Sequence, residues 1–305
     1  MINYYQKMLK SLKLRKLKDF RVGSAVIAFN LQEDELKLLS SKFSLDYGLL
    51  NDALDPYEAP RMEIKKGLIY IFARFPRQRD NNEQIFTDPI LLVVGQDFLL
   101  SVSQEEPIFI KNLLKKNECF TTQRTKLLLE IINQTEYLYN NLLTTIHKKI
   151  NYFSFNIEKV KDKDIYSFLN FEVLLNEFLN ALIPLRHILE TMKQGKIIEL
   201  YEEDREFIDD IKLLNDQLIE RAKSGLSNLV NIRKSYEVIT TNKLNRTMKL
   251  LTTITVVLAL PTMIASFYGM NVHLPYADKH WIFGALMGAM ILSIFVFLII
   301  FRRNK

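Results

Sequence analysis

The chain has 305 residues, and 41 lysine and arginine residues against 35 aspartate and glutamate residues give it a formal net charge of +6. From residue 250 to residue 301 the only Asp, Glu, Lys or Arg residues are Asp278 and Lys279. This asymmetry excludes a simple soluble enzyme, and the apolar and aromatic content of the remainder excludes disorder. The single cysteine, Cys119, excludes an intrachain disulfide and a cysteine-based zinc site.

The first 30 residues carry seven basic side chains, which interrupt every apolar run that a secretory signal needs. We therefore expect the bulk of the protein to be cytoplasmic. A nucleic-acid-binding arm is the alternative interpretation, but no nucleic-acid-binding motif accompanies the charges, so a solvated or lipid-facing basic edge is favoured. The residues are Lys7, Lys10, Lys13, Arg15, Lys16, Lys18 and Arg21.

Residues 1–120 contain all the strand signals and are predicted to form an α/β domain with a modest sheet. A short buried strand is predicted over residues 24–29, followed by a helix over residues 31–43 with Asn30 as its N-cap. A second short helix is predicted over residues 46–54, before a proline. Further strands are predicted over residues 68–75, 89–94 and 98–102.

From residue 121 onward the pattern is helical, with helices predicted over residues 121–150, 157–193 and 199–268. In the third segment, apolar residues recur at mostly three- and four-residue steps between Phe207 and Ile239. A helix of this length measures about 105 Å at 1.5 Å per residue. It is typical of a stalk that associates with copies of itself, so residues 121–245 are assigned to a cytoplasmic helical and stalk region.

Residues 250–268 and 281–301 each have the length that a helix needs to cross a bilayer. Basic residues precede the first span and follow the second, so the positive-inside rule places both termini in the cytoplasm. Residues 246–305 are therefore predicted to be a transmembrane hairpin with a cytoplasmic basic tail. The alternative, a buried hairpin of a soluble protein, is disfavoured by the strongly apolar end of the second span. The flanking basic residues are Arg246, Lys249, Arg302, Arg303 and Lys305.

One face of the first span carries small or hydroxyl-bearing side chains at alternating steps of three and four residues. Such a stripe has two interpretations. It packs against the second span, because small residues allow close approach, or it lines a pore made by several copies. The stripe consists of Thr252, Thr255, Ala259, Thr262 and Ser266, with Met248 and Asn245 as its extension toward the N-terminus.

The first span ends in Tyr268-Gly269-Met270-Asn271, which resembles the signature of the CorA family of divalent-cation transporters. Residues 245–252, Asn-Arg-Thr-Met-Lys-Leu-Leu-Thr, resemble the family's approach to the membrane, and residues 51–63 resemble part of its cytoplasmic domain. The resemblance covers essentially the whole chain. It implies a homopentameric channel whose subunits have an α+β cytoplasmic domain, as an αβα sandwich, then a long stalk helix and a two-helix transmembrane hairpin.

The resemblance also implies functional residues. The selectivity filter would comprise Tyr268, Gly269, Met270 and Asn271. The regulatory site would bind cytoplasmic Mg²⁺ between Asp52 of one subunit and Asp210, beside Asp209, on the stalk of its neighbour. Ala259 stands where the family often has methionine, so Met248 and Leu251 are the candidates for a hydrophobic constriction. The pore-lining residues would be Asn245, Met248, Leu251, Thr252, Thr255, Ala259, Thr262 and Ser266.

The function implied is passive Mg²⁺ uptake across a bacterial plasma membrane, with Mg²⁺ as cargo and regulatory ligand and membrane lipid as the surroundings. No glycine-rich phosphate-binding loop or nucleophile–base constellation is visible, so neither an organic cofactor nor an enzyme is expected. Transport of Co²⁺, Ni²⁺ or Zn²⁺ on the same scaffold is one alternative. A membrane-anchored coiled-coil scaffold or sensor is another, but it leaves the stripe and the Gly-Met-Asn triplet unexplained.

Overall fold

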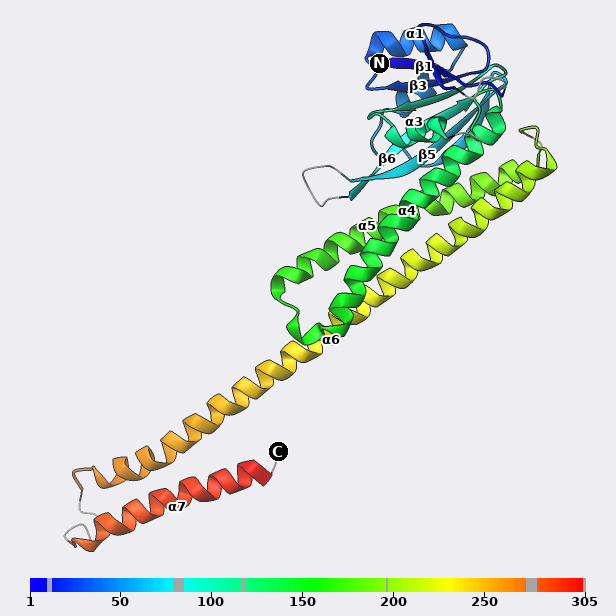
Figure 1. Cartoon of the computed structure of the whole chain (residues 1–305). Coiled ribbons are helices and arrows are strands. Elements are labelled where there is room, and N and C mark those ends of the chain that lie inside the picture. The colour runs from blue at the N-terminus through cyan, green and yellow to red at the C-terminus, as the bar shows by residue number, and fades with distance from the viewer. Residues whose placement is uncertain (10–12, 79–84, 117–118, 196, 273–278, 304–305) are drawn as a thin grey trace. The chain divides into compact units, whose positions relative to one another are not determined.

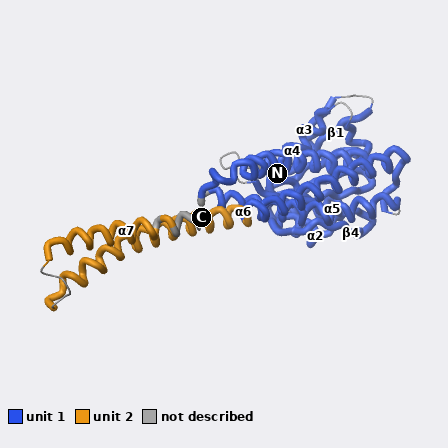
Figure 2. Tube along the Cα trace, turned by 90° about the horizontal axis from the view of Figure 1, so that it is seen from below, with its two compact units in different colours: residues 1–233 blue, residues 234–305 orange. Residues whose placement is uncertain are grey.

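The computed structural model describes residues 1–9, 13–78, 85–116, 119–195, 197–272 and 279–303. The chain divides into two compact units, residues 1–233 and residues 234–305 (Figure 2). Helix α6, Glu202–Tyr268, contributes residues to both units. The three-part division at residues 120 and 245 stays a prediction.

Seven strands among the described residues of the first unit form one mixed sheet, in the order β2-β1-β3-β7-β6-β5-β4. Strands β3 and β7 are parallel, and the other neighbouring strands are antiparallel. The strands are β1 Ile2–Gln6, β2 Arg15–Leu17, β3 Ser24–Phe29, β4 Arg61–Lys65, β5 Leu68–Gln78, β6 Ile85–Val94 and β7 Phe98–Ser103.

Helices cover both faces of this sheet, which gives three layers (Figure 1). Alternate side chains of β3 enter different cores: Val26 and Ala28 pack under α1 and α2, whereas Ala25 and Ile27 pack against α3, α4 and α5. The expected α/β domain, long helix and apolar helices are thus present. The helices are α1 Glu33–Phe43, α2 Tyr47–Asp52, α3 Ile108–Lys115, α4 Arg124–Phe155, the 3₁₀ helix η1 Ile157–Lys159, α5 Asp162–Lys193, α6 and α7 Trp281–Arg303.

The sheet is larger than the sequence indicates. The strand predicted over residues 24–29 is confirmed as β3, but the sequence patterns do not predict β1, β2 and β4. In β1, Tyr4, Tyr5 and Gln6 are all buried, so the strand lacks the alternation of a half-exposed strand. Strands β2 and β4 are the two edges of the sheet, where charged residues are common and mask a strand signal.

The predicted start of α1 is wrong by two residues. Asn30 has a φ of 47°, a left-handed conformation that is unsuited to an N-cap. Its backbone N–H instead donates to the carbonyl oxygens of Ser103 and Gln104. The helix begins at Glu33, and the N–H of the N-cap residue Gln32 donates to Glu35 Oε2 at 3.1 Å.

The recurring apolar residues of α6 between Phe207 and Ile239 are covered mainly by other helices of the same chain. Ile211, Leu218 and Leu229 are buried there. Arg221 Nη2 donates to Thr144 Oγ1 on α4 at 2.9 Å, and a Cβ at Gly225 would lie 3.0 Å from a methyl group of Leu175 on α5. Association with other copies is therefore not needed to bury this part of the helix.

One residue of the expected basic edge is buried. Lys7 is 1% exposed, and its ammonium group donates to the carbonyl oxygens of Leu114, at 3.4 Å, and Lys116 at the end of α3. Its backbone N–H donates to Thr121 Oγ1 at 2.9 Å. Lys10 lies outside the described residues, and the remaining members of the set, Lys13, Arg15, Lys16, Lys18 and Arg21, are exposed.

We expect Lys7→Met to lower the free energy of unfolding by about 1–3 kcal/mol, because two carbonyl groups, of which that of Leu114 is buried, lose a charged donor. Thermal unfolding of the purified full-length protein in detergent measures the loss. Lys16→Met on β2 is the control, because the side chain is exposed and the change should stay within about 0.5 kcal/mol. Equal melting temperatures for the two variants would contradict a structural role for Lys7.

Candidate functional site

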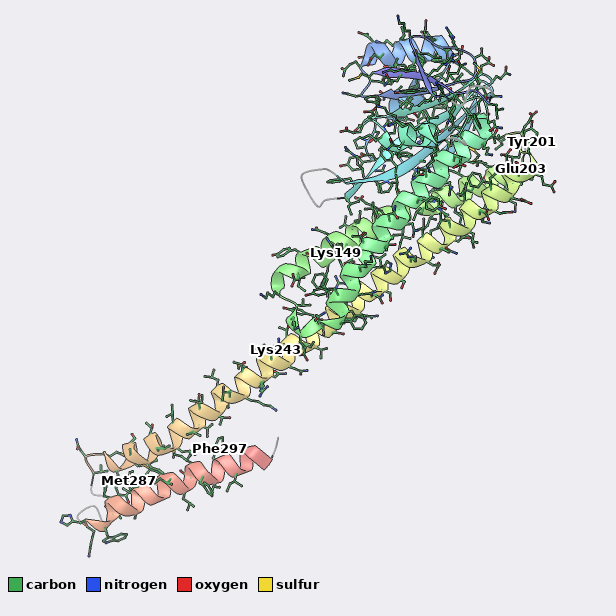
Figure 3. The ribbon with its side chains drawn as sticks, viewed as in Figure 1. Lys149, Tyr201, Glu203, Lys243, Met287 and Phe297 are labelled. Atoms are coloured by element: carbon green, nitrogen blue, oxygen red, sulfur yellow. The ribbon has the colours of Figure 1, made fainter. Side chains whose placement is uncertain are left out.

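In the second unit, α7 runs alongside the end of α6 (Figures 1 and 3). The half-buried side chains of each helix recur at three- or four-residue steps, so one face of each helix packs on the other. On α6 these residues are Thr253, Val256, Val257, Leu260, Pro261 and Ile264. On α7 they are Ile282, Leu286, Met290, Ser293, Ile294 and Phe297.

The predicted stripe of small and hydroxyl residues lies on another side of α6. Thr252, Thr255, Ala259, Thr262 and Ser266 are all exposed. At about 100° per residue, this stripe is roughly opposite the face that packs on α7. Within one chain, the stripe is therefore not the surface that packs on the second span.

The threonine hydroxyl groups of the stripe are oriented by the helix itself. Thr252 Oγ1 donates to the carbonyl oxygen of Met248 at 2.9 Å, and Thr262 Oγ1 donates to that of Leu258 at 2.7 Å. Thr255 makes the same bond to Leu251 at 2.9 Å. Because each hydroxyl hydrogen is already used, the exposed oxygen can act only as an acceptor. A row of acceptors matches the outward-pointing hydrogens of a hydrated cation.

The predicted filter residues follow at one end of the stripe. Tyr268 is the last residue of α6, and the N–H of Gly269 donates to the carbonyl oxygen of Ala265 at 2.9 Å. A Cβ at Gly269 would lie 3.3 Å from that same oxygen, a close approach that favours glycine. Met270 and Asn271 are exposed. Of the residues that connect the two predicted spans, 273–278 lie outside the described residues.

At the other end of the stripe, Asn245, Met248 and Leu251 are also exposed on α6. All the predicted pore-lining residues therefore lie on the uncovered part of one helix. The structure does not describe the side chains of Arg302 and Arg303 or residues 304–305, so the basic tail stays a prediction.

Among the described residues, two helices contain apolar stretches long enough to cross a membrane. In α6 the apolar window has no buried residue. The other is α5, but 39% of its window is buried, and Leu185, Leu189 and Met192 belong to the core under the sheet. A shorter apolar stretch spans Trp281–Phe297 in α7. Burial thus separates the core helix α5 from the two helices predicted to span the membrane.

Two of the three predicted regulatory carboxylates, Asp52 and Asp209, already have partners within one chain. Asp52 Oδ2 accepts a hydrogen bond from Arg61 Nη2 at 2.8 Å, and the same guanidinium pairs with Glu58 and with Glu63 at 2.6 Å. Asp209 pairs with Lys193 Nζ at 2.5 Å, whereas Asp210 is exposed beside it. Sequence reasoning assigned no role to Arg61. This residue begins β4, a strand rich in charged residues. In the part of the chain that the structure describes, no three His, Cys, Asp or Glu side chains are grouped to hold a metal ion.

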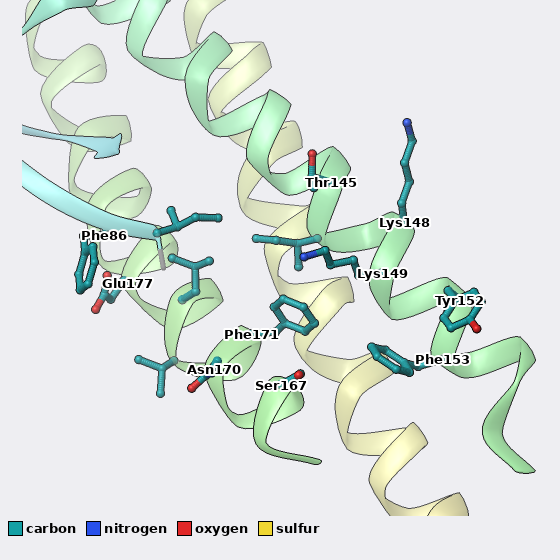
Figure 4. Close-up of a pocket in the computed structure, with 14 residues that line it drawn as sticks. Phe86, Thr145, Lys148, Lys149, Tyr152, Phe153, Ser167, Asn170, Phe171 and Glu177 are labelled. Atoms are coloured by element: carbon teal, nitrogen blue, oxygen red, sulfur yellow. The ribbon is translucent and has the colours of Figure 1, made fainter. Parts of the chain in front are cut away.

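A cavity of about 660 Å³ lies between α4, α5 and the start of β6 (Figure 4). Its wall includes Phe153 and Phe171, and the ammonium group of Lys149 lies 6.0 Å from the ring centroid of Phe171. Among the described lining residues Glu177 is the only acid. An apolar wall with lysines does not suit a divalent cation, so this cavity is not the candidate site.

Comparison with known proteins identifies the family. The family model described as "CorA-like Mg2+ transporter protein" matches residues 26–303. The chain belongs to the CorA family. It is 26% identical, over 90% of its length and 89% of the relative's, to the protein named "Cobalt/magnesium transport protein CorA" from Methanocaldococcus jannaschii. Membership places the chain among membrane transporters.

Solved structures show the same fold. The complete structure of the CorA magnesium transporter from Methanocaldococcus jannaschii matches with a TM-score of 0.85 and 24% identity, covering 100% of this chain and 98% of that one. The structure of the full-length CmaX protein matches with a TM-score of 0.77 and 14% identity, covering 99% and 97%. The α/β domain, the long helix and the apolar helices are therefore those of a full-length CorA fold.

Proposed function

We propose that the chain forms a homopentameric channel that conducts Mg²⁺ passively across the plasma membrane into the cytoplasm. The observation that carries this proposal is the exposed stripe of acceptors on α6, opposite the face that packs on α7 and ending at Gly269-Met270-Asn271. Facing hydrocarbon, these oxygens would keep their bonds to the carbonyl groups of the helix but would find no donor to accept from. Several copies of α6 arranged in a ring would instead place them around water.

The chemistry of the stripe suits a hydrated ion. Mg²⁺ loses its waters reluctantly, so a pathway that accepts hydrogen bonds from the hydration shell is easier to pass than one that strips it. The stripe has no carboxylate, so it holds the ion weakly enough to release it. Inward movement of two charges across 100 mV releases about 4.6 kcal/mol, which drives uptake without ATP.

Each segment of the chain has a place in the proposed channel. Residues 1–120 are the cytoplasmic α/β domain, residues 121–245 the helical and stalk region, and residues 246–305 the transmembrane hairpin. Both termini would lie in the cytoplasm, because the basic residues flank the hairpin on that side. The filter would comprise Tyr268 to Asn271, at the outer mouth. Asn245, Met248 and Leu251 would line the inner mouth, and the five stripe residues would line the path between them.

Transport of Co²⁺ is the second candidate, because the Methanocaldococcus jannaschii relative is named for both cobalt and magnesium. The oxygen acceptors of the stripe favour the harder ion, Mg²⁺. Uptake of Mg²⁺, Co²⁺, Ni²⁺ and Zn²⁺ into proteoliposomes, measured in parallel, separates these functions. A scaffold or sensor without transport would show no flux of any of the four ions.

Gating would come from Mg²⁺ bound between Asp52 and the stalk of the neighbouring subunit, at Asp210 with Asp209 beside it. A divalent ion turns the repulsion of facing carboxylates into a bridge and holds the subunits in a closed arrangement. Loss of the ion at low internal Mg²⁺ would release them. The ion would compete with Arg61 for Asp52 and with Lys193 for Asp209.

Asn271→Ala should abolish Mg²⁺ flux into proteoliposomes while the protein still elutes as a pentamer, because the variant removes an acceptor at the outer mouth. Asn242→Ala is the matched control, since Asn242 is exposed on α6 but lies away from the stripe. We expect this control to conduct normally. Normal flux through Asn271→Ala would sink the filter assignment.

Cysteines placed at Thr255, Thr262 and Ser266 in a Cys119→Ser background should react with a small water-soluble thiol reagent in membranes. Cysteines at Leu258 and Ile264 should not react, because these positions would face lipid or α7. Mass shift after labelling of membrane vesicles measures the reaction. Equal labelling at both groups of positions would show that the stripe does not line a water-filled path.

Asp52→Ala combined with Asp210→Ala should remove the protection from proteolysis that millimolar Mg²⁺ gives to the purified protein. Asp34→Ala combined with Asp97→Ala is the control, because it removes two exposed carboxylates elsewhere. The control should keep the protection of the unmodified protein. If the first double variant also keeps it, Asp52 and Asp210 are not the sensor.

A further inference from the structure

The interface between α4 and α6 contains a fully buried carboxyl group that the proposed transport does not use. Glu136 on α4 and Asn215 on α6 are each 0% exposed. Asn215 Nδ2 donates to Glu136 Oε1 at 2.8 Å. The other oxygen of each group, Glu136 Oε2 and Asn215 Oδ1, has no hydrogen-bonding partner. Buried polar atoms of this kind normally have one, so both require an explanation.

The charged groups around the pair do not neutralise Glu136. Asp216, the next residue on α6, pairs with Arg186 of α5, with Nε and Oδ1 separated by 3.1 Å. On the other side, the buried Tyr139 of α4 donates its hydroxyl hydrogen to the carbonyl oxygen of Arg74 on β5 at 3.0 Å. Glu177 of α5 also faces Tyr139. Among the described residues no cation forms an ion pair with Glu136.

Protonation of Glu136 would satisfy both unpartnered oxygens at once. An ionised carboxylate can only accept hydrogen bonds, so it offers nothing to the amide oxygen of Asn215. A protonated carboxyl group donates from Oε2 to Asn215 Oδ1 while Oε1 still accepts from Nδ2. The acid and the amide then form a ring closed by two hydrogen bonds, and neither residue carries a charge in the core.

We propose that Glu136 is a neutral carboxylic acid paired reciprocally with Asn215, and that this pair is a pH-sensitive latch between α4 and α6 that loosens when Glu136 ionises. The latch goes beyond Mg²⁺ transport and does not depend on it.

The electrostatics fix the pH range of the latch. Burial raises the pKa of Glu136 to about 8, with the charge of Asp216 adding to the rise and the bond from Asn215 opposing it. The folded protein therefore keeps a proton that the unfolded chain, with a pKa of 4.5, has lost. The stability contribution is complete below the unfolded pKa, falls as pH rises toward about 8 and is constant above it.

Glu136→Gln tests the latch, because glutamine can form the same ring with Asn215 and does not titrate. The melting temperature of the full-length protein in detergent would be measured from about pH 5 to about pH 9. We expect the difference in melting temperature, variant minus unmodified protein, to grow with pH by at least about 5 °C across this range. The growth should level off near pH 8. Glu130→Gln, the same change at a half-buried residue of α4, should run parallel to the unmodified protein.

A second measurement reads the proton directly. The infrared spectrum of the unmodified protein should contain a carbonyl stretch of a protonated carboxyl group at neutral pH, which disappears as pH rises through about 8. The same band should be missing from Glu136→Gln and retained in Glu130→Gln. The proposal is overturned if the unmodified protein lacks the band, or if Glu136→Gln and the unmodified protein have parallel melting curves.

Discussion

A single chain can cover only part of α6, and the rest of the architecture depends on what covers the remainder. In the first unit, α4 and α5 bury the face that includes Ile211 and Leu218. In the second unit, α7 packs on the face that includes Leu260, while residues such as Leu250 and Leu258 stay exposed. Large apolar side chains in this position are stable against lipid, whereas the acceptor oxygens of the hydroxyl groups beside them would find no donor there. Under the proposed function, the two kinds of exposed surface would have two different neighbours, lipid for one and other copies of α6 for the other.

The threonines show how a helix in lipid can present polarity without charge. Each hydroxyl hydrogen is used by the carbonyl group one turn earlier, which removes a donor from the surface and leaves an acceptor. Acceptors without charge can take hydrogen bonds from the hydration shell of a cation, and they attract the bare ion less strongly than carboxylates do. Carboxylates in the same positions would bind Mg²⁺ more tightly and slow its release. Under the proposed function, selectivity for a hydrated ion and rapid release would thus have the same physical origin.

How much the sequence predicts depends on whether a feature is local. The strand at residues 24–29, the long helix α6 and the helix α7 could be predicted because burial and periodicity are visible within one segment. The filter residues could be proposed from a motif that follows the first span directly. Strands β2 and β4 could not, because their partners make them strands, and neither could the burial of Lys7, which depends on carbonyl groups more than 100 residues away. Pairs such as Glu136 with Asn215 are likewise products of tertiary packing.

Two carboxyl groups of the first unit, one buried and one partly exposed, lie in different electrostatic surroundings. The difference bears on the proposed gating. Among the described residues no cation pairs with buried Glu136, so protonation would be the means of removing its charge. Partly exposed Asp52 stays near Arg61, which also serves Glu58 and Glu63, so a divalent ion arriving there must displace a guanidinium or share its carboxylates. Asp210 is exposed, and Lys193 is paired with Asp209. A divalent ion that binds Asp210 therefore does not have to displace Lys193 from it. Competition at one half of a bridging site lowers its affinity for Mg²⁺. Under the proposed gating, Arg61 would therefore set the internal Mg²⁺ concentration at which the channel closes, and would set it higher than the carboxylates alone.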